Sequence, residues 1–168
     1  MKRCIIFLLI LSLVIAITGC RREQKLEDPT PFYYCKRQIT YNEKDNVFTA
    51  EQREAKDISS IDMLIEDYLK GPNDNNMVSI FPSSLEIKNL TNENGYLTIE
   101  FSPHLSRLSP SETTLACTAL SLTLFDYADV LAIEFLADGV SFNGKESMTI
   151  TRDVLLFSDT APQKDPAQ

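Results

Sequence analysis

The amino-acid sequence predicts one α+β domain, a two-layer sandwich in which two helices lie on one mixed sheet. Two segments carry helical periodicity together with start and stop signals. Strand-like runs come in pairs before, between and after these segments. The expected order is therefore ββ-α-ββ-α-ββ over residues 32–157, after a targeting segment and a tether and before a disordered tail at 158–168.

The first helix begins near Asp57 or Ser59, either of which can serve as its N-cap. Polar residues occupy the face opposite its apolar stripe. Gly71-Pro72 ends it, because glycine accepts the left-handed C′ conformation and proline cannot continue a helix. The apolar positions that repeat with the helical period are Ile58, Ile61, Leu64, Ile65, Tyr68 and Leu69.

The second helix begins at a capping box, in which Ser109 and Glu112 satisfy each other's main-chain N–H groups and Pro110 takes the first helical position. It extends to about Tyr127 and is apolar on nearly all sides, so we expect it to be deeply buried or covered by a partner. If the domain leaves its outer face uncovered, the interaction surface consists of Thr118, Leu122 and Phe125.

The strands are predicted from short β-branched or aromatic runs bounded by turn residues. Asn94-Gly95 is the strongest hairpin signal, because both residues accept positive φ in a type I′ turn. The last strand has two alternatives, Met148–Ile150 and Val154–Phe157. The other expected strands are 32–36, a strand beginning at 47–50 after the turn cluster 42–46, the pair around 85–87 and 97–101, and the continuous apolar run 130–136.

The N-terminus predicts a bacterial lipoprotein. Lys2 and Arg3 precede an apolar run that is too short to span a bilayer but suits a signal peptide. The run ends in Ile17-Thr18-Gly19-Cys20, which resembles a lipobox. Residues 1–19 would be removed and Cys20 would carry the diacylglyceryl and palmitate chains. An uncleaved N-terminal helix is the alternative, and the charges of Arg21 and Arg22 disfavour it.

Charge and tether length describe how such a protein would sit at the membrane. Without residues 1–19 the chain has 14 basic and 24 acidic side chains, a net charge of −10 rather than −8. This charge argues against nucleic acid as a partner and against adsorption to anionic lipid. The tether 20–31 reaches about 40 Å at most, which would hold the domain against the extracytoplasmic face of the cell membrane.

The sequence contains no recognisable active site. His104, the only histidine, lies among serines in a loop without a nucleophile-elbow motif, so we interpret it as an exposed loop residue rather than a catalytic base. No calcium loop, phosphate loop or zinc ligand set is present, and we predict no metal, no cofactor and no enzymatic activity. Of the cysteines remaining after Cys20, Cys35 and Cys117, we favour buried free thiols over a disulfide.

Several pieces of the sequence, in order, resemble the GerMN domain of sporulation and spore germination proteins. They are the helix stop Leu69–Pro72, the apolar-proline step Ile80–Pro82, the strand Gly95–Ser102 with its Phe-Ser end, and the strand Ile133–Gly139 closing on Asp-Gly after a long Ala- and Leu-rich helix. The chain departs from the family at 125–129, where Phe-Asp-Tyr-Ala-Asp replaces a Phe-Pro-Gly-like step. It also carries one copy of the domain, whereas some members carry two.

The resemblance implies a fold like the ring-building modules of secretion and sporulation complexes. It also implies a non-catalytic surface lipoprotein of a Gram-positive spore former, whose partner is a protein of an envelope complex or a second copy. A ligand-binding lipoprotein is the alternative, in which Phe32, Tyr33 and Tyr34 form an aromatic shelf for cell-wall glycan; strand aromatics more often pack against a helix. An enzyme that uses His104 is the weakest hypothesis.

Overall fold

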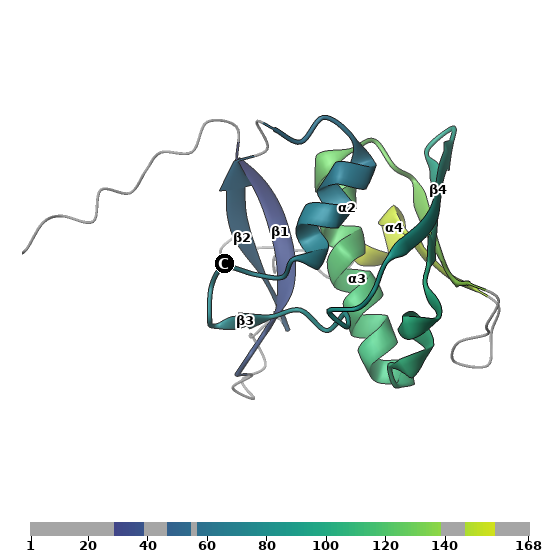
Figure 1. Cartoon of the computed structure of the whole chain (residues 1–168). Coiled ribbons are helices and arrows are strands. Elements are labelled where there is room, and N and C mark those ends of the chain that lie inside the picture. Colours follow the sequence, from purple (N-terminus) through teal and green to yellow (C-terminus); the bar gives the residue numbers. More distant parts are fainter. Residues whose placement is uncertain (1–28, 39–46, 55–56, 139–146, 157–168) are drawn as a thin grey trace, which may run out of the picture.

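The computed structural model describes residues 29–38, 47–54, 57–138 and 147–156. Within these ranges an antiparallel three-stranded sheet and a mixed four-stranded sheet lie on either side of a layer of helices (Figure 1). The sequence predicted one mixed sheet carrying two helices, and this detail is wrong. The predicted mixture of paired strands and intervening helices is otherwise present. The lipobox, the turn cluster 42–46 and the tail 158–168 lie outside the described residues.

The first sheet contains three strands in the order β2-β1-β3. Strand β1 (Pro29–Lys36) pairs antiparallel with β2 (Phe48–Glu54) along seven residue pairs, from Pro29–Glu54 to Cys35–Phe48. The strand β3 (Met77–Val78) pairs only with the end of β1, at Cys35 and Lys36. The expected tether therefore ends before Pro29, because residues 29–31 already belong to the ladder.

The second sheet contains four strands in the order β4-β5-β6-β7. Strands β4 (Ile87–Glu93) and β5 (Tyr96–Phe101) form the predicted hairpin, and Asn94 and Gly95 both have positive φ, +54° and +83°. Strand β6 (Ala132–Ala137) runs parallel to β5, and β7 (Ser147–Thr151) returns antiparallel beside β6. Of the two alternatives for the last strand, the one at Met148–Ile150 is confirmed.

The helical layer consists mainly of α2 (Ile61–Leu69) and α3 (Pro110–Tyr127). Ser60, rather than Asp57 or Ser59, is the N-cap of α2, and Gly71 follows its end with φ of +87°. The predicted capping box of α3 is confirmed by hydrogen bonds in both directions between Ser109 and Glu112. A 3₁₀ turn, η1 (Pro103–Arg107), precedes α3.

A short helix, α4 (Arg152–Leu156), occupies the segment that includes most of the other predicted last strand. The Arg152 side chain fixes the start of α4 by donating hydrogen bonds to the carbonyls of Phe125, in the last turn of α3, and of Ala128 and Val130, which follow it. These bonds satisfy carbonyls that a helix C-terminus leaves without partners, and they draw the chain out of the sheet.

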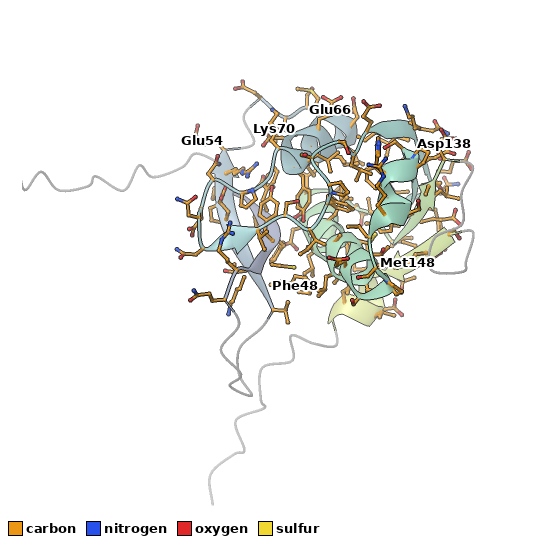
Figure 2. All side chains as sticks on the ribbon, turned by 60° about the horizontal axis from the view of Figure 1, so that its bottom comes forward. Phe48, Glu54, Glu66, Lys70, Asp138 and Met148 are labelled. Atoms are coloured by element: carbon orange, nitrogen blue, oxygen red, sulfur yellow. The ribbon has the colours of Figure 1, made fainter. Side chains whose placement is uncertain are left out.

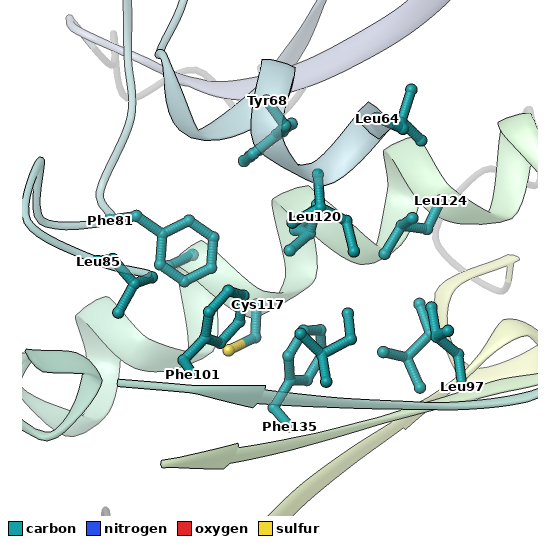
Figure 3. Packing of buried hydrophobic residues seen from close by; sticks show 14 of the residues in the cluster. Leu64, Tyr68, Phe81, Leu85, Leu97, Phe101, Cys117, Leu120, Leu124 and Phe135 are labelled. Carbon is teal, nitrogen blue, oxygen red and sulfur yellow. The ribbon is translucent and has the colours of Figure 1, made fainter. Parts of the chain in front are cut away.

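The core extends over both sides of the helical layer: side chains of the four-stranded sheet pack on one side (Figure 3), and Phe32 and Tyr34 of β1 belong to the same cluster. Helix α3 is buried around most of its circumference, as its apolar composition predicted. Inward-facing side chains of β5 and β6 pack against it, and Phe81 and Phe101 link the core to the loop before β4, with ring centroids 5.5 Å apart. Fully buried members of this cluster include Leu97, Ile99, Phe101, Leu120, Leu124, Ile133 and Phe135.

Candidate interaction surfaces

The α3 face that the sequence singled out is largely covered within the domain. Phe125 is only 6% exposed, and the Arg152 guanidinium lies 5.3 Å from the centre of its ring. Thr118 and Leu122 are half-buried. Phe125 therefore belongs to the core rather than to a free surface, because α4 and its arginine cover the end of α3. Whether Thr118 and Leu122 contact a partner stays a prediction.

The aromatic residues of β1 form packing and hydrogen bonds with the helices instead of a shelf for a ligand. Phe32 and Tyr34 are fully buried. The Tyr34 ring stacks on that of Tyr68 with centroids 4.6 Å apart, and its hydroxyl donates to the Tyr68 carbonyl. The Tyr33 hydroxyl donates to Asp126 at 2.8 Å. The glycan alternative thus loses two of its three proposed aromatic contacts.

Helices close the open edge of β1 where β3 does not pair with it. The Tyr33 N–H donates to the Thr123 hydroxyl of α3 at 2.9 Å, and the Tyr33 carbonyl accepts from the Tyr68 hydroxyl of α2 at 2.8 Å. Since alternate residues of an antiparallel strand point to the same edge, Pro31 and Pro29 point this way too, and proline has no N–H to satisfy. Side chains of the helices therefore replace a missing strand along this edge.

Arg53 joins β2 to the end of α2 through an extensive set of side-chain contacts. It bonds Glu51 at 2.6 Å, the Asp67 carboxylate at 3.0 Å and the Gly71 carbonyl at 2.6 Å. Its guanidinium lies 4.5 Å from the centre of the Phe32 ring. The side chains of Arg53 and Glu51 are 11% and 12% exposed and are largely removed from bulk water, whereas that of Asp67 is 30% exposed.

Glu51 and Asp67 are the acidic members of this network. Burial alone would raise the pKa of Glu51, but hydrogen bonds from Arg53 and from the main-chain N–H groups of Asn73 and Asp74 outweigh burial and lower it. Burial likewise opposes ionisation of Asp67, and bonds from Lys70 and Arg53 lower its pKa nonetheless. Both carboxylates are therefore held ionised, which suits a structural clamp rather than proton transfer.

His104 has a serine neighbour but not the environment of a catalytic base. Its Nδ1 lies 3.3 Å from the Ser102 hydroxyl oxygen. Ser102 is only 3% exposed, and its hydroxyl oxygen also accepts from the Glu86 N–H. A buried serine that bonds the main chain cannot present its oxygen to a substrate, so the Ser102–His104 pair fits a loop contact. His104 itself is half-buried rather than exposed, a small departure from the expectation.

The two cysteines are buried free thiols, as predicted. Burial raises the pKa of both Cys35 and Cys117, and Cys117 is fully buried against the core. A raised pKa disfavours the thiolate that nucleophilic chemistry and metal binding require. Within the described ranges no group of three or more His, Cys, Asp and Glu side chains could hold a metal ion.

A groove of about 400 Å³ lies between α2 and the start of β4. Three apolar side chains and two carboxylates line it, and the Glu86 carboxylate pairs with Lys88 at 3.1 Å. Figure 2 shows Glu66 at the surface of α2. The lining residues are Glu66, Leu69, Leu85, Glu86 and Ile87. A groove of mixed chemistry without convergent polar groups is a contact surface more than a reaction site.

Sequence reasoning missed two features. One is the network of Arg53, Glu51 and Asp67, which we call the Arg53 clamp, and the other is the closure of the β1 edge by α2 and α3. One local signal existed. Glu51 and Arg53 are two residues apart in a strand and therefore lie on the same face, and charged residues that face inward from a strand are unusual. The partners of these residues come from α2 and α3, at sequence separations that no local pattern encodes. In the described part of the chain, no helix has the length and apolar composition needed to cross a membrane.

Comparison with known proteins agrees with this fold. The chain is similar to the first GerMN domain of the sporulation protein GerM from Bacillus subtilis, with a TM-score of 0.54 and 12% identity over 76% of this chain and 99% of that domain. It is also similar to the tandem GerMN domains of the same protein, with a TM-score of 0.53 and 18% identity over 74% of this chain. It spans 45% of that tandem structure.

At these identities the solved structures establish similarity of fold. No curated protein sequence is significantly similar to the chain. The family assignment comes from the family model, Germane, described as sporulation and spore germination, which matches residues 31–142. That range begins within β1, ends beyond β6 and includes both major helices. Since the match covers more than half of the chain, the protein belongs to the Germane family of sporulation and spore germination.

Proposed function

We propose that this protein is a lipid-anchored, non-catalytic interaction module that acts in sporulation or spore germination. The single observation that carries the proposal is the family match over residues 31–142. The chemistry of the described side chains supports it, because the charged residues with the most bonds serve as clamps and the cysteines are buried. The partner is a protein of the cell envelope or a second copy of the chain.

Deletion of the gene in the spore-forming host tests the biological role. We expect normal vegetative growth with a reduced yield of heat-resistant spores or slower germination, restored by the full-length chain. Normal sporulation together with normal germination of the deletion strain would refute the proposal.

The anchor has its own test at Cys20. In Cys20→Ala, palmitate labelling and recovery of the protein in the membrane fraction should both be lost. A thioether-linked lipid requires the thiol, and two acyl chains hold a protein at the bilayer. Cys4→Ala is the matched control, since it changes the cysteine within the expected signal peptide and should leave labelling intact. Labelling that persists in Cys20→Ala would contradict the lipobox interpretation.

A further inference from the structure

The open edge of β7 differs from the other sheet edges among the described residues, which belong to β2, β4 and β3, and β3 has only two residues. Strand β2 has Glu51 and Arg53 in its ladder, and β4 contains charged residues and a register shift between Ile87 and Asn89. Charges and bulges of this kind protect an edge against pairing with another strand. Strand β7, with the sequence Ser-Met-Thr-Ile-Thr, has no charge, proline, glycine or bulge.

The ladder between β6 and β7 fixes which main-chain groups of β7 point outward. The Arg152 N–H donates to the Leu131 carbonyl, so Arg152–Leu131 is a hydrogen-bonded pair. In an antiparallel ladder such pairs alternate, and therefore Met148 and Ile150 exchange bonds with β6. The main-chain groups of Ser147, Thr149 and Thr151 then point to the open edge. Thr149 at the centre is exposed.

Strand β7 is complementary to itself around Thr149. A two-fold axis at Thr149 would pair Thr149 with Thr149 of a second copy and Ser147 with Thr151. Met148 and Ile150 would face each other on the core side of the sheet, and the hydroxyl side chains would align on the other side. Threonine pairs and apolar pairs across strands stabilise such ladders, and about six main-chain hydrogen bonds would form between the copies, two for each of the three hydrogen-bonded pairs.

The net negative charge of the chain also favours β7 as the strand at which two copies meet. Two copies of a chain with 24 acidic and 16 basic residues repel each other, and the repulsion is least where the contacting strands are uncharged. Strands β7 and β2 belong to different sheets, so pairing at β7 leaves the Arg53 clamp and the three-stranded sheet accessible. An isologous contact of this kind closes at two copies.

We propose that β7 pairs antiparallel with β7 of a second copy, joining two four-stranded sheets into one continuous sheet centred on Thr149. The inference rests on the proposed interaction function and names the partner and the surface. The sporulation phenotype of a deletion strain tests that function independently of this contact, so the failure of one is distinguishable from failure of the other.

Cysteine cross-linking of the full-length chain in membranes tests the register. Opposed residues of a hydrogen-bonded antiparallel pair have Cα atoms about 5.5 Å apart, within the span of a disulfide. Thr149→Cys should therefore give a disulfide-linked dimer under mild oxidation. Thr91→Cys, an exposed threonine on the opposite edge of the same sheet, is the matched control and should give only the background of the unsubstituted chain. Equal dimer yields for both variants, or a product containing a different protein, would overturn the proposal.

Charged substitutions at Thr149 distinguish loss of strand pairing from misfolding of the domain. Thr149→Lys and Thr149→Glu each place like charges opposite one another, and each should weaken recovery of one tagged copy by another roughly fivefold. Co-expression of the Lys and Glu variants should restore recovery, because opposite charges then meet across the axis. A mixture that stays as weak as either variant alone would overturn the contact.

Discussion

The three-stranded and the four-stranded sheet flank the same helices, yet they contact them through different chemistry. Strands β5 and β6 meet α3 with apolar side chains alone, such as Ile99, Phe101 and Phe135. Strands β1 and β2 meet α2 and α3 through tyrosine hydroxyls, a threonine hydroxyl and the Arg53 network. Strand β1 also buries Phe32 and Tyr34, so the three-stranded side adds directed polar contacts to apolar burial, whereas the four-stranded side depends on burial.

This difference follows from the shape of each sheet. The four-stranded sheet is wide enough to cover α3 with its inner face, so apolar contact suffices. Strand β1 instead presents an edge to α3, and a buried edge exposes main-chain groups that require partners. The polar contacts on that side are therefore a consequence of how β1 approaches the helix.

The largest effect is expected on the apolar side. Phe101→Ala removes a fully buried ring that contacts both Phe81 and Phe135, and it should lower the free energy of unfolding by about 3–5 kcal/mol. Urea unfolding of the chain without residues 1–20, followed by circular dichroism, measures the change. Thr98→Ala, on the outer face of the same strand, should change stability by less than about 1 kcal/mol. Similar losses for the two variants would mean that the inner face of β5 is not the main core.

The Arg53 clamp should give the next largest effect. Arg53→Met keeps much of the side-chain volume but leaves Glu51 and Asp67 without their shared cation, and we expect a loss of about 2–4 kcal/mol. Arg37→Met is the control. Arg37 is exposed and donates to the Asn75 and Met77 carbonyls, so its loss should cost less than about 1 kcal/mol. Equal effects would show that the clamp contributes no more than a surface arginine does.

The parts of the fold that sequence could predict are those specified by neighbouring residues. The turn at Asn94-Gly95, the capping box at Ser109 and the stop at Gly71 are local, and each lies where its residues predicted it. The separate three-stranded sheet was missed because β3 has two residues and no pattern, and because the pairing of β1 with β3 joins distant segments. The apolar segment after Thr151 fits a strand or a helix equally well, and the Arg152 contacts select the helix.

The same reasoning explains the outcome for the surface predicted on α3. Periodicity identified a helix that is apolar all round, but it could not say which neighbours cover Phe125. Arg152 lies outside that helix in sequence, and its position over the Phe125 ring depends on the return of β7. The buried thiols were predictable, because Cys35 and Cys117 lie within regular apolar segments.

Closure of the β1 edge gives a smaller and more specific test. Thr123→Val preserves shape but removes the acceptor of the Tyr33 N–H, which would then be buried without a partner; we expect a loss of about 1–3 kcal/mol. Thr114→Val, at an exposed position of the same helix, should be close to neutral. Thr123→Ser should recover most of the loss because it restores the hydroxyl. If Thr123→Ser were as unstable as Thr123→Val, the loss of stability would come from packing rather than from the hydrogen bond.

Acid should reduce the contribution of the Arg53 clamp, and this effect is the smallest because both carboxylates keep some contact with water. The pKa values of Glu51 and Asp67 are lowered in the folded state, so the stability they contribute is complete above their unfolded pKa values, near pH 4, and is lost as the pH falls through the folded values. In Arg53→Met, protonation instead relieves an unpaired Glu51. The difference in unfolding free energy between the unsubstituted chain and Arg53→Met should therefore be larger at pH 7 than at pH 3, whereas Lys70→Met, which removes a largely exposed cation, should show a weaker trend. A difference that does not change with pH would mean that Arg53 stabilises the domain through its contacts with carbonyls and aromatic rings. The three-stranded side would then depend less on ion pairs than its contacts suggest.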